Sequence, residues 1–335
     1  MKSRFFEYRH RINYDQSALS LYDFFGLYSE HQTTKEAMKG MKKKRAENKD
    51  LLHNGKKLSA WSLFWGFPIV WMIAGAIGII LIDTLFRQLT AQFDGIVSLI
   101  FTLITGFLAI LVYKLTLTYL ARQSTPEISG KRAGIETVLG VLIGTLFITG
   151  SAFIIMALGG YSFQWAGSTD TSFVLISSIE AALGAAVIEE LIFRGLMLQA
   201  IDKLGGKTLA LAVTSLFFGV AHLGNTGATL WSALAIALEA GVLLGAAFLW
   251  RRNLWFTMGL HFAWNAVEGL LGIPVSGHAA NGLFTVKVNG AALLTGGDFG
   301  LEGSIVPVVV SLLISIPMLI TFYAHFDNGR KRMRD

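Results

Sequence analysis

Long apolar stretches alternate with short polar segments from residue 61 onward. Each of eight stretches is close to the ~20 residues that an α-helix needs to cross the hydrocarbon core of a bilayer. These stretches are residues 61–82, 96–118, 134–158, 172–200, 208–224, 230–250, 254–272 and 304–324. The pattern predicts an all-α, polytopic membrane helix bundle with about eight transmembrane helices.

Polar segments flank the predicted bundle at both ends. Residues 1–58 hold 13 of the 28 Lys and Arg residues, which predicts a basic cytosolic N-terminal arm. Residues 59–325 form the predicted transmembrane bundle, and residues 326–335 form a basic cytosolic tail. The long connection at 273–303 contains "TVKV", whose alternation of polar and apolar residues predicts a short hairpin within that loop.

The charged residues predict the orientation of the bundle. With both termini in the cytosol, 24 of the 28 Lys and Arg residues lie on the inner side and two lie in outer loops. This distribution explains the net charge of +6 without a nucleic-acid partner. Only 15% of residues are charged, against about a quarter in soluble domains. The chain has no cysteine, which excludes disulfides and thiolate metal sites.

Several ionisable side chains lie inside the predicted spans. A charge at the bilayer centre costs roughly 2.5–3.5 kcal/mol on insertion scales, so such residues face the bundle interior or a water-filled cavity. The residues concerned are Glu180, Glu189, Glu190, Arg194, His222, Glu239, His261 and Glu268. They are the candidates for function, although some of them also fit a packing role. We expect Glu239 to form a hydrogen bond across helices or to line a cavity.

Two adjacent acids in "VIEELIFRG" point in different directions on a helix. Glu190 and Arg194 are four residues apart, with the acid on the N-terminal side, so they share a face and can form an ion pair. Glu189 is rotated by about 100° from Glu190. The spacing therefore predicts that Glu190 is neutralised by Arg194 and that Glu189 is available as a general base.

Two histidines on other spans complete a set that can hydrolyse an amide. Phe218 lies one turn before His222, and Asn265 lies one turn after His261. A Glu and a His can hold and deprotonate a water, while a His and an amide can donate hydrogen bonds to an oxyanion. A Glu with two His residues also has the donor types of a zinc site, and the spacing leaves this alternative open.

Three short motifs now point to a family. "EELIFR" (189–194), "FGVAH" (218–222) and "HFAWN" (261–265) resemble, in order, the EExxxR, FxxxH and HxxxN motifs of the CPBP (Abi) family. That family includes type II CAAX prenyl proteases and bacteriocin-processing enzymes. The resemblance covers roughly residues 134–324, and the loop stretch "TGGDFGLEGS" also resembles a Gly-rich segment of bacterial members.

The resemblance implies an intramembrane glutamic protease without a metal cofactor, with zinc as the less favoured alternative. It assigns catalytic roles to Glu189, His222, His261 and Asn265, and supporting roles to Glu190, Arg194 and Phe218. Glu189 would activate the water together with His222. His261 and Asn265 would form the oxyanion hole, and Glu190 with Arg194 would brace the site.

We therefore expect a multi-pass protein of a bacterial cell membrane that cleaves a peptide or prenylated protein. Its expected partners are this substrate and the lipid bilayer, with no nucleic acid. One alternative is a non-enzymatic bacteriocin immunity or partner-binding protein. Another is a transporter that uses Glu180, Glu190 and Glu239 as a proton relay. In every case the three motifs lie at unequal depths along straight spans, so a shared site requires tilted helices or shifted span edges.

Overall fold

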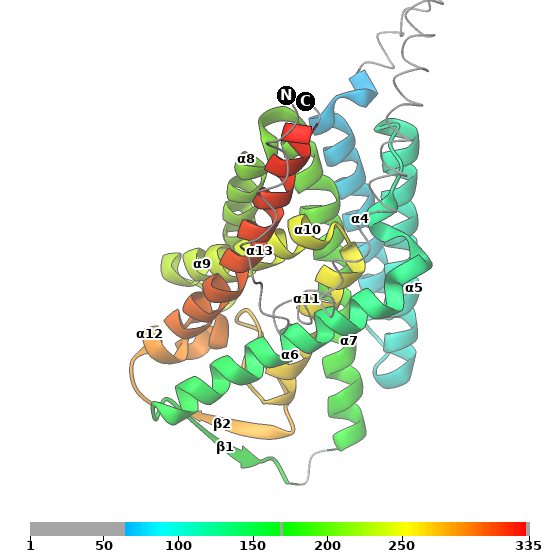
Figure 1. The fold of residues 1–335 in the computed structure, drawn as a ribbon. Coiled ribbons are helices and arrows are strands. Elements are labelled where there is room, and N and C mark those ends of the chain that lie inside the picture. The colour runs from blue at the N-terminus through cyan, green and yellow to red at the C-terminus, as the bar shows by residue number, and fades with distance from the viewer. Residues whose placement is uncertain (1–63, 168–169, 333–335) are drawn as a thin grey trace, which may run out of the picture. The chain divides into compact units, whose positions relative to one another are not determined.

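Helices account for nearly all regular structure in the computed structural model, which describes residues 64–167 and 170–332 (Figure 1). The α-helices are α4 (Pro68–Thr90), α5 (Gly95–Leu115), α6 (Ala133–Ala157), α7 (Thr171–Glu190), α8 (Leu198–Ala221), α9 (Leu230–Ile236), α10 (Val242–Arg251), α11 (Leu254–Leu270), α12 (Ala292–Thr295) and α13 (Ile305–Arg332). π-Helical turns are η2 (Thr116–Leu120), η5 (Leu191–Met197) and η7 (Ala237–Gly241), and short 3-10 turns include η3 (Pro126–Ile128), η6 (His222–Gly224) and η9 (Leu301–Gly303). The predicted basic arm, residues 1–58, lies outside the described residues.

The all-α polytopic bundle is confirmed, although its helices do not correspond one to one with the eight expected spans. Within the described residues, six helical segments are long and apolar enough to span a membrane. The predicted fourth and fifth spans form one helical segment, Thr171–Gly224, that is broken where Gly206 adopts a non-helical conformation (φ 82°, ψ 171°). The predicted seventh span is α11, which has only 17 residues. The number of crossings and the cytosolic placement of both termini stay predictions.

Side-chain caps begin three of the helices that form the bundle interior. The Asp170 carboxylate accepts the backbone N–H groups of the first turn of α7, and the Asn253 amide oxygen does the same for α11. Thr229 and Ser232 form a capping box at the start of α9. Such caps satisfy N–H groups that have no partner within the helix. Leaving these groups unpaired costs free energy where water is scarce.

The hairpin predicted within 273–303 is wrong, because its strand pairs elsewhere. Strand β2 (Phe284–Val288) pairs antiparallel with β1 (Tyr161–Trp165), in the register Tyr161↔Val288. The alternation in "TVKV" correctly indicated a strand, but its partner follows α6, far away in the sequence. The Tyr161 hydroxyl donates to the Thr295 carbonyl at 2.5 Å and fixes the ribbon to the loop before α13.

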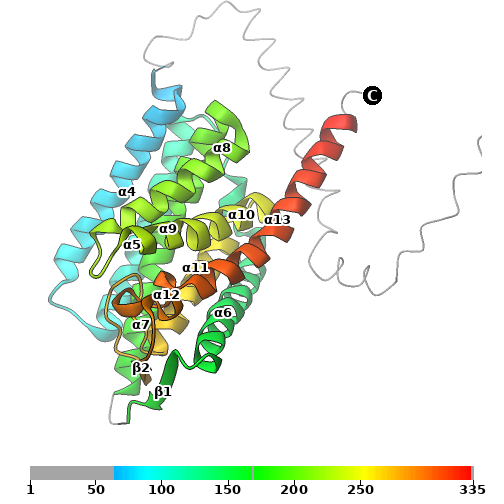
Figure 2. The same cartoon turned by 90° about the vertical axis from the view of Figure 1, so that its left-hand side faces the viewer.

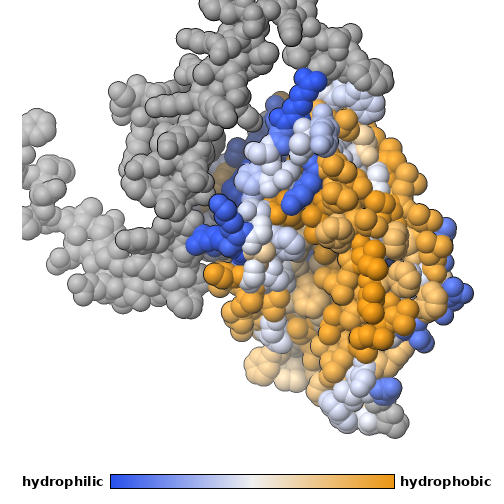
Figure 3. Space-filling model, turned by 90° about the vertical axis from the view of Figure 1, so that its right-hand side faces the viewer, coloured by the Kyte–Doolittle hydropathy of each residue, from blue (hydrophilic) through white to orange (hydrophobic). Residues whose placement is uncertain are grey.

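The described bundle presents the surface expected of a protein embedded in lipid. In the peripheral helices α4 and α5, only 17% of the most apolar 18-residue stretch is buried. Phe107 on α5 and Leu146 on α6 are 67% and 72% exposed, and apolar side chains cover most of one face (Figure 3). A soluble protein rarely exposes an apolar surface of this extent. The helix α4 begins, and α13 ends, at the side opposite the β-ribbon (Figure 2).

Glycines let α6 and α11 approach closely, and this contact places α11 beside α7. A Cβ on Gly140 would lie 2.1 Å from the Phe256 carbonyl oxygen, and one on Gly144 would lie 2.4 Å from that of Leu260. On the other helix, a Cβ on Gly259 would lie 2.4 Å from the Thr137 carbonyl oxygen. Helix α6 runs obliquely to α4, α5 and α7 (Figure 1).

Substitution of Gly144 by Ala should destabilise the bundle by about 1–3 kcal/mol, because the added methyl group meets backbone rather than a flexible side chain. Gly150 is the matched control on the same helix, since its Cβ would meet nothing within 4 Å. Thermal unfolding in detergent should show a lower midpoint for Gly144→Ala and an unchanged or higher midpoint for Gly150→Ala. Equal midpoints for the two variants would contradict the close approach of α6 and α11.

Candidate active site

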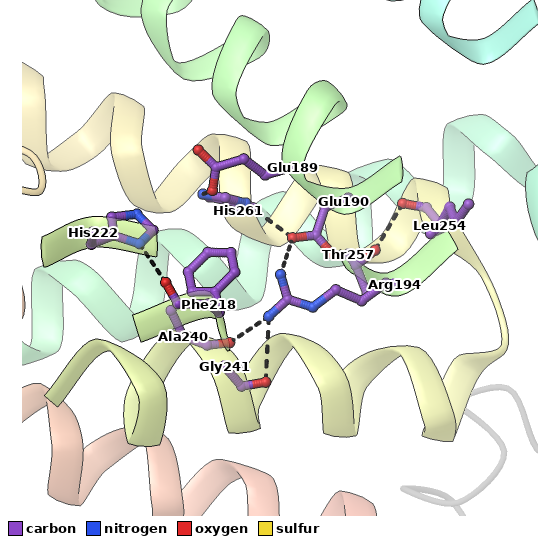
Figure 4. Close-up of polar contacts among 10 residues, drawn as sticks. All are labelled: Glu189, Glu190, Arg194, Phe218, His222, Ala240, Gly241, Leu254, Thr257 and His261. Carbon is purple, nitrogen blue, oxygen red and sulfur yellow. Dashed lines mark hydrogen bonds and ion pairs between the residues drawn. The ribbon is translucent and has the colours of Figure 1, made fainter. Parts of the chain in front are cut away.

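The three sequence motifs converge in the interior of the bundle (Figure 4). Glu189 and Glu190 end α7, and Arg194 lies in the π-helical turn η5 that follows directly. Phe218 and His222 come from the end of α8 and the start of η6. His261 and Asn265 lie one turn apart on α11. π-Helical turns inside α-helices occur frequently at functional sites.

A buried ion pair holds the centre of this arrangement. The Arg194 Nη1 donates to Glu190 Oε1 at 2.8 Å, and the two side chains are 2% and 0% exposed. This confirms the pair expected from their spacing. The Arg194 Nη2 donates to the carbonyl oxygens of Ala240 (2.9 Å) and Gly241 (3.3 Å) in η7. The sequence analysis missed these two acceptors, since a backbone carbonyl has no signature in the side-chain pattern.

The Phe218 ring covers the guanidinium of this pair. The Arg194 Cζ lies 4.5 Å from the ring centroid, a distance at which a desolvated cation is attracted to an aromatic face. Phe193 packs edge-on against the same ring, with 4.9 Å between the centroids. Phe218, predicted to have a supporting role, therefore contacts Arg194 through its ring and His222 through its backbone carbonyl.

His261 lies between the two glutamates, which the sequence analysis did not foresee. Its Nδ1 is 3.0 Å from Glu190 Oε1, and its Nε2 is 4.0 Å from Glu189 Oε2. An ionised carboxylate only accepts hydrogen bonds, so Nδ1 carries a proton that it donates to Glu190. The distance of 4.0 Å exceeds a direct hydrogen bond and is the kind of gap that one water can bridge.

Glu189 opens onto a cavity of about 680 Å³, whereas its neighbour Glu190 does not. The Glu189 side chain is 29% exposed, and the cavity is also lined by His222 and Asn265. Three of the four residues predicted as catalytic thus line one cavity. The fourth, His261, does not line it but lies 4.0 Å from Glu189. Adjacent positions on one helix have different surroundings, as the rotation of about 100° per residue requires.

The imidazole of His222 is oriented by its own helix. Its Nδ1 lies 2.6 Å from the Phe218 carbonyl oxygen, and because a carbonyl only accepts, Nδ1 is the donor. In the neutral ring this leaves Nε2 as a hydrogen-bond acceptor. That nitrogen lies on the side of the ring that faces Glu189 in the view of Figure 4.

A tight turn over the cavity was missed by the sequence analysis. The Asn225 amide donates to the Ser276 carbonyl oxygen at 2.8 Å, and the Ser276 hydroxyl donates to Glu302 Oε2 at 2.6 Å. The Gly277 N–H donates to the Phe299 carbonyl oxygen at 2.7 Å. Burial raises the pKa of the Glu302 carboxyl, and the bond from Ser276 opposes that rise. The glycine-rich stretch "TGGDFGLEGS" was the one signal of this packing, since it contains both Phe299 and Glu302.

The remaining intramembrane acids, Glu180, Glu239 and Glu268, do not line this cavity. Glu180 accepts a hydrogen bond from the Ser98 hydroxyl at 2.5 Å, and Glu268 accepts one from the Leu301 N–H at 3.0 Å. Glu239 is fully buried, and neither of its carboxylate oxygens has a hydrogen-bond partner among the described groups. The expected bond from Glu239 across helices is therefore wrong, and Glu239 is not among the residues that line the 680 Å³ cavity.

A zinc site would need several donor side chains directed at one point. In the ranges 64–167 and 170–332, no group of three His, Asp or Glu side chains is arranged so that it could hold a metal ion. The expectation that the site uses no metal stays a prediction, for which a chelator is the direct test.

Comparison with known proteins agrees with the motifs. Residues 171–267 match the family described as Rce1-like, type II CAAX prenyl endopeptidase Rce1-like. This stretch runs from the start of α7 to near the end of α11 and contains all three motifs. The match covers 97 of the 335 residues and supports the resemblance of this chain to the CPBP (Abi) family. The chain matches no curated protein and no solved structure.

The ion pair predicts a pronounced coupling between Glu190 and Arg194. Either Arg194→Met or Glu190→Gln alone should cost about 3–5 kcal/mol of stability, because each leaves one buried group without its partner. The double variant should cost much less than the sum of the two, and thermal unfolding of all four proteins measures the difference. Additive costs would show that the two side chains do not depend on one another.

Proposed function

We propose that this chain is an intramembrane endopeptidase in which Glu189 and His222 activate a water for attack on a peptide bond. The observation that carries the proposal is the difference between two neighbouring acids. Glu190 is fully buried and paired with Arg194, while Glu189 faces the cavity that His222 and Asn265 also line. Since Glu190 is committed to Arg194 and does not line the cavity, Glu189 is the carboxylate that can reach a water there, and we assign it as the base.

The reaction that fits these groups proceeds without a covalent enzyme intermediate. The Glu189 carboxylate takes a proton from the water while His222 Nε2 accepts its second hydrogen bond. The hydroxide adds to the substrate carbonyl carbon, and the Asn265 amide stabilises the resulting oxyanion. The proton held by Glu189 then passes to the leaving nitrogen. The products are a new carboxylic acid, which then releases its proton, and a new amine.

His261 fits the oxyanion hole only in a particular protonation state. Its Nδ1–H is committed to Glu190, so Nε2 can donate to an oxyanion only when the ring is an imidazolium. The carboxylates of Glu189 and Glu190 on either side favour that cation electrostatically. We therefore assign the second oxyanion donor to protonated His261, held in place by Glu190 and Arg194.

The substrate class follows from the family match and from the place of the site. A type II CAAX prenyl endopeptidase is the described family, so a prenylated C-terminal peptide is the first substrate to test. The site lies inside a bundle with an apolar surface, which suits a substrate that partitions into the bilayer. An origin in a bacterial cell membrane and a role in bacteriocin processing or immunity stay predictions.

Replacement of Glu189 by Gln should reduce cleavage by about 10²–10⁴-fold, because the amide cannot take a proton from the water. The assay is release of a C-terminal fragment from a fluorogenic peptide, farnesylated or unmodified, by purified protein in liposomes. Glu180→Gln is the matched control, since Glu180 lies on the same helix and bonds only to Ser98 among the contacts described. Its activity should stay within twofold of the wild type.

Full cleavage by Glu189→Gln would sink the proposal, and so would a folded wild type that cleaves neither peptide. A chelator forms the second arm of the same assay. Unchanged rates in the chelator are expected, whereas a loss restored by added zinc would replace the glutamic mechanism with a metal mechanism.

A further inference from the structure

A second buried polar cluster contacts Gly195, the residue that follows Arg194 of the candidate active site. It consists of Tyr113 near the end of α5, Glu127 in η3 and Gln199 in α8. Tyr113 is 0% exposed and Glu127 is 5% exposed. Tyr113 and Glu127 both precede residues 171–267, the stretch that matches the family. Neither the motifs nor the proposed chemistry assigns a role to these side chains.

The hydrogen bonds of the cluster start from the side-chain amide of Gln199. The Gln199 Nε2 donates to the Tyr113 hydroxyl oxygen at 3.0 Å, and that hydroxyl donates in turn to Glu127 Oε1. The same Gln199 amide donates to the Gly195 carbonyl oxygen at 2.8 Å. This nitrogen also lies 3.4 Å from Glu127 Oε1, so its two hydrogens face three acceptors, of which this one is the most distant. The network therefore connects Tyr113 and Glu127 to the backbone of η5.

Gly195 connects this network to the active site. It follows Arg194 directly, and the ring of Tyr113 packs against it so closely that a Cβ on Gly195 would lie 2.7 Å from the Tyr113 Cε2. The backbone of the π-helical turn is thus held by a bond at its carbonyl and by a ring at its Cα. Arg194 is fixed at its backbone by this contact and at its guanidinium by Glu190.

We infer that Tyr113, Glu127 and Gln199 are positioning residues for the site. They hold Gly195, and through it Arg194 and Glu190, in the place where Glu190 receives the Nδ1–H of His261. Catalytic geometry tolerates little displacement, and side chains that lock the supporting residues are needed for that reason. The kinetic part of this inference rests on the proposed function, whereas the structural part does not.

Two substitutions remove single hydrogen-bonding groups and keep the volume nearly constant. Tyr113→Phe deletes the hydroxyl but leaves the ring against Gly195, and Gln199→Met deletes both donors. Tyr161→Phe is the matched control, because the Tyr161 hydroxyl is also buried and also bonds across elements, to the Thr295 carbonyl away from the site. Thermal unfolding should show similar losses for Tyr113→Phe and Tyr161→Phe.

The first readout is the ¹⁵N NMR signal of His261 in protein labelled at its seven histidines, assigned by its loss in His261→Gln. The Nδ1 signal should shift in Tyr113→Phe and Gln199→Met and stay in place in Tyr161→Phe. The second readout is peptide cleavage, in which the first two variants should lose about tenfold in kcat at nearly constant KM.

The outcomes separate this inference from the proposed function. A shifted His261 signal in a protein that cleaves no peptide would support the positioning role and overturn the protease. An unshifted signal in both variants would overturn the positioning role, whatever the activity. An equal shift of the His261 signal in Tyr161→Phe would also overturn it, since the shift would then reflect a general loss of stability.

Discussion

The ion pair between Glu190 and Arg194 is the interaction on which the rest of the site depends. Both charges are removed from water, and further contacts offset part of that cost. Arg194 donates to two carbonyl groups of η7 and lies over the Phe218 ring. Glu190 Oε1 also accepts from His261 Nδ1, while Glu190 Oε2 is buried without a hydrogen-bond partner among the described groups. One buried pair therefore connects residues of all three motifs, on α7, η5, α8 and α11, to each other and to the backbone of η7.

The pair also creates the chemical difference between two neighbouring glutamates. Because Glu190 satisfies the arginine, Glu189 has no cationic partner on its own helix and faces the cavity. His261 contacts the first acid directly and approaches the second at 4.0 Å, so it connects the structural carboxylate to the reactive one. The close glycine contacts between α6 and α11 lie directly before that histidine, so packing against α6, a helix that carries no motif, contributes to the geometry at the site.

Local spacing was enough to predict part of this picture. The pairing of Glu190 with Arg194 and the separate direction of Glu189 follow from 3.6 residues per turn, and the membrane bundle follows from the apolar stretches. The contact of Glu190 with His261 depends on how α7 and α11 pack together, which no single helix encodes. The strand "FTVKV" shows the same limit, because its alternation indicates a strand but not that β1 is its partner. The bonds of Arg194 to backbone carbonyls likewise have no side-chain pattern, whereas the break at Gly206 falls in the gap between the predicted spans 172–200 and 208–224.

Selective labelling of carboxylates tests most directly the claim that the two adjacent acids have different roles. A water-soluble carbodiimide with glycine ethyl ester modifies accessible carboxylates, and peptide mass spectrometry locates each label. The account predicts that Glu189, at 29% side-chain exposure, is modified and that cleavage falls in proportion, while Glu190 at 0% stays unmodified. Labelling of Glu190 at an equal or higher rate, or full activity with Glu189 labelled, would contradict it.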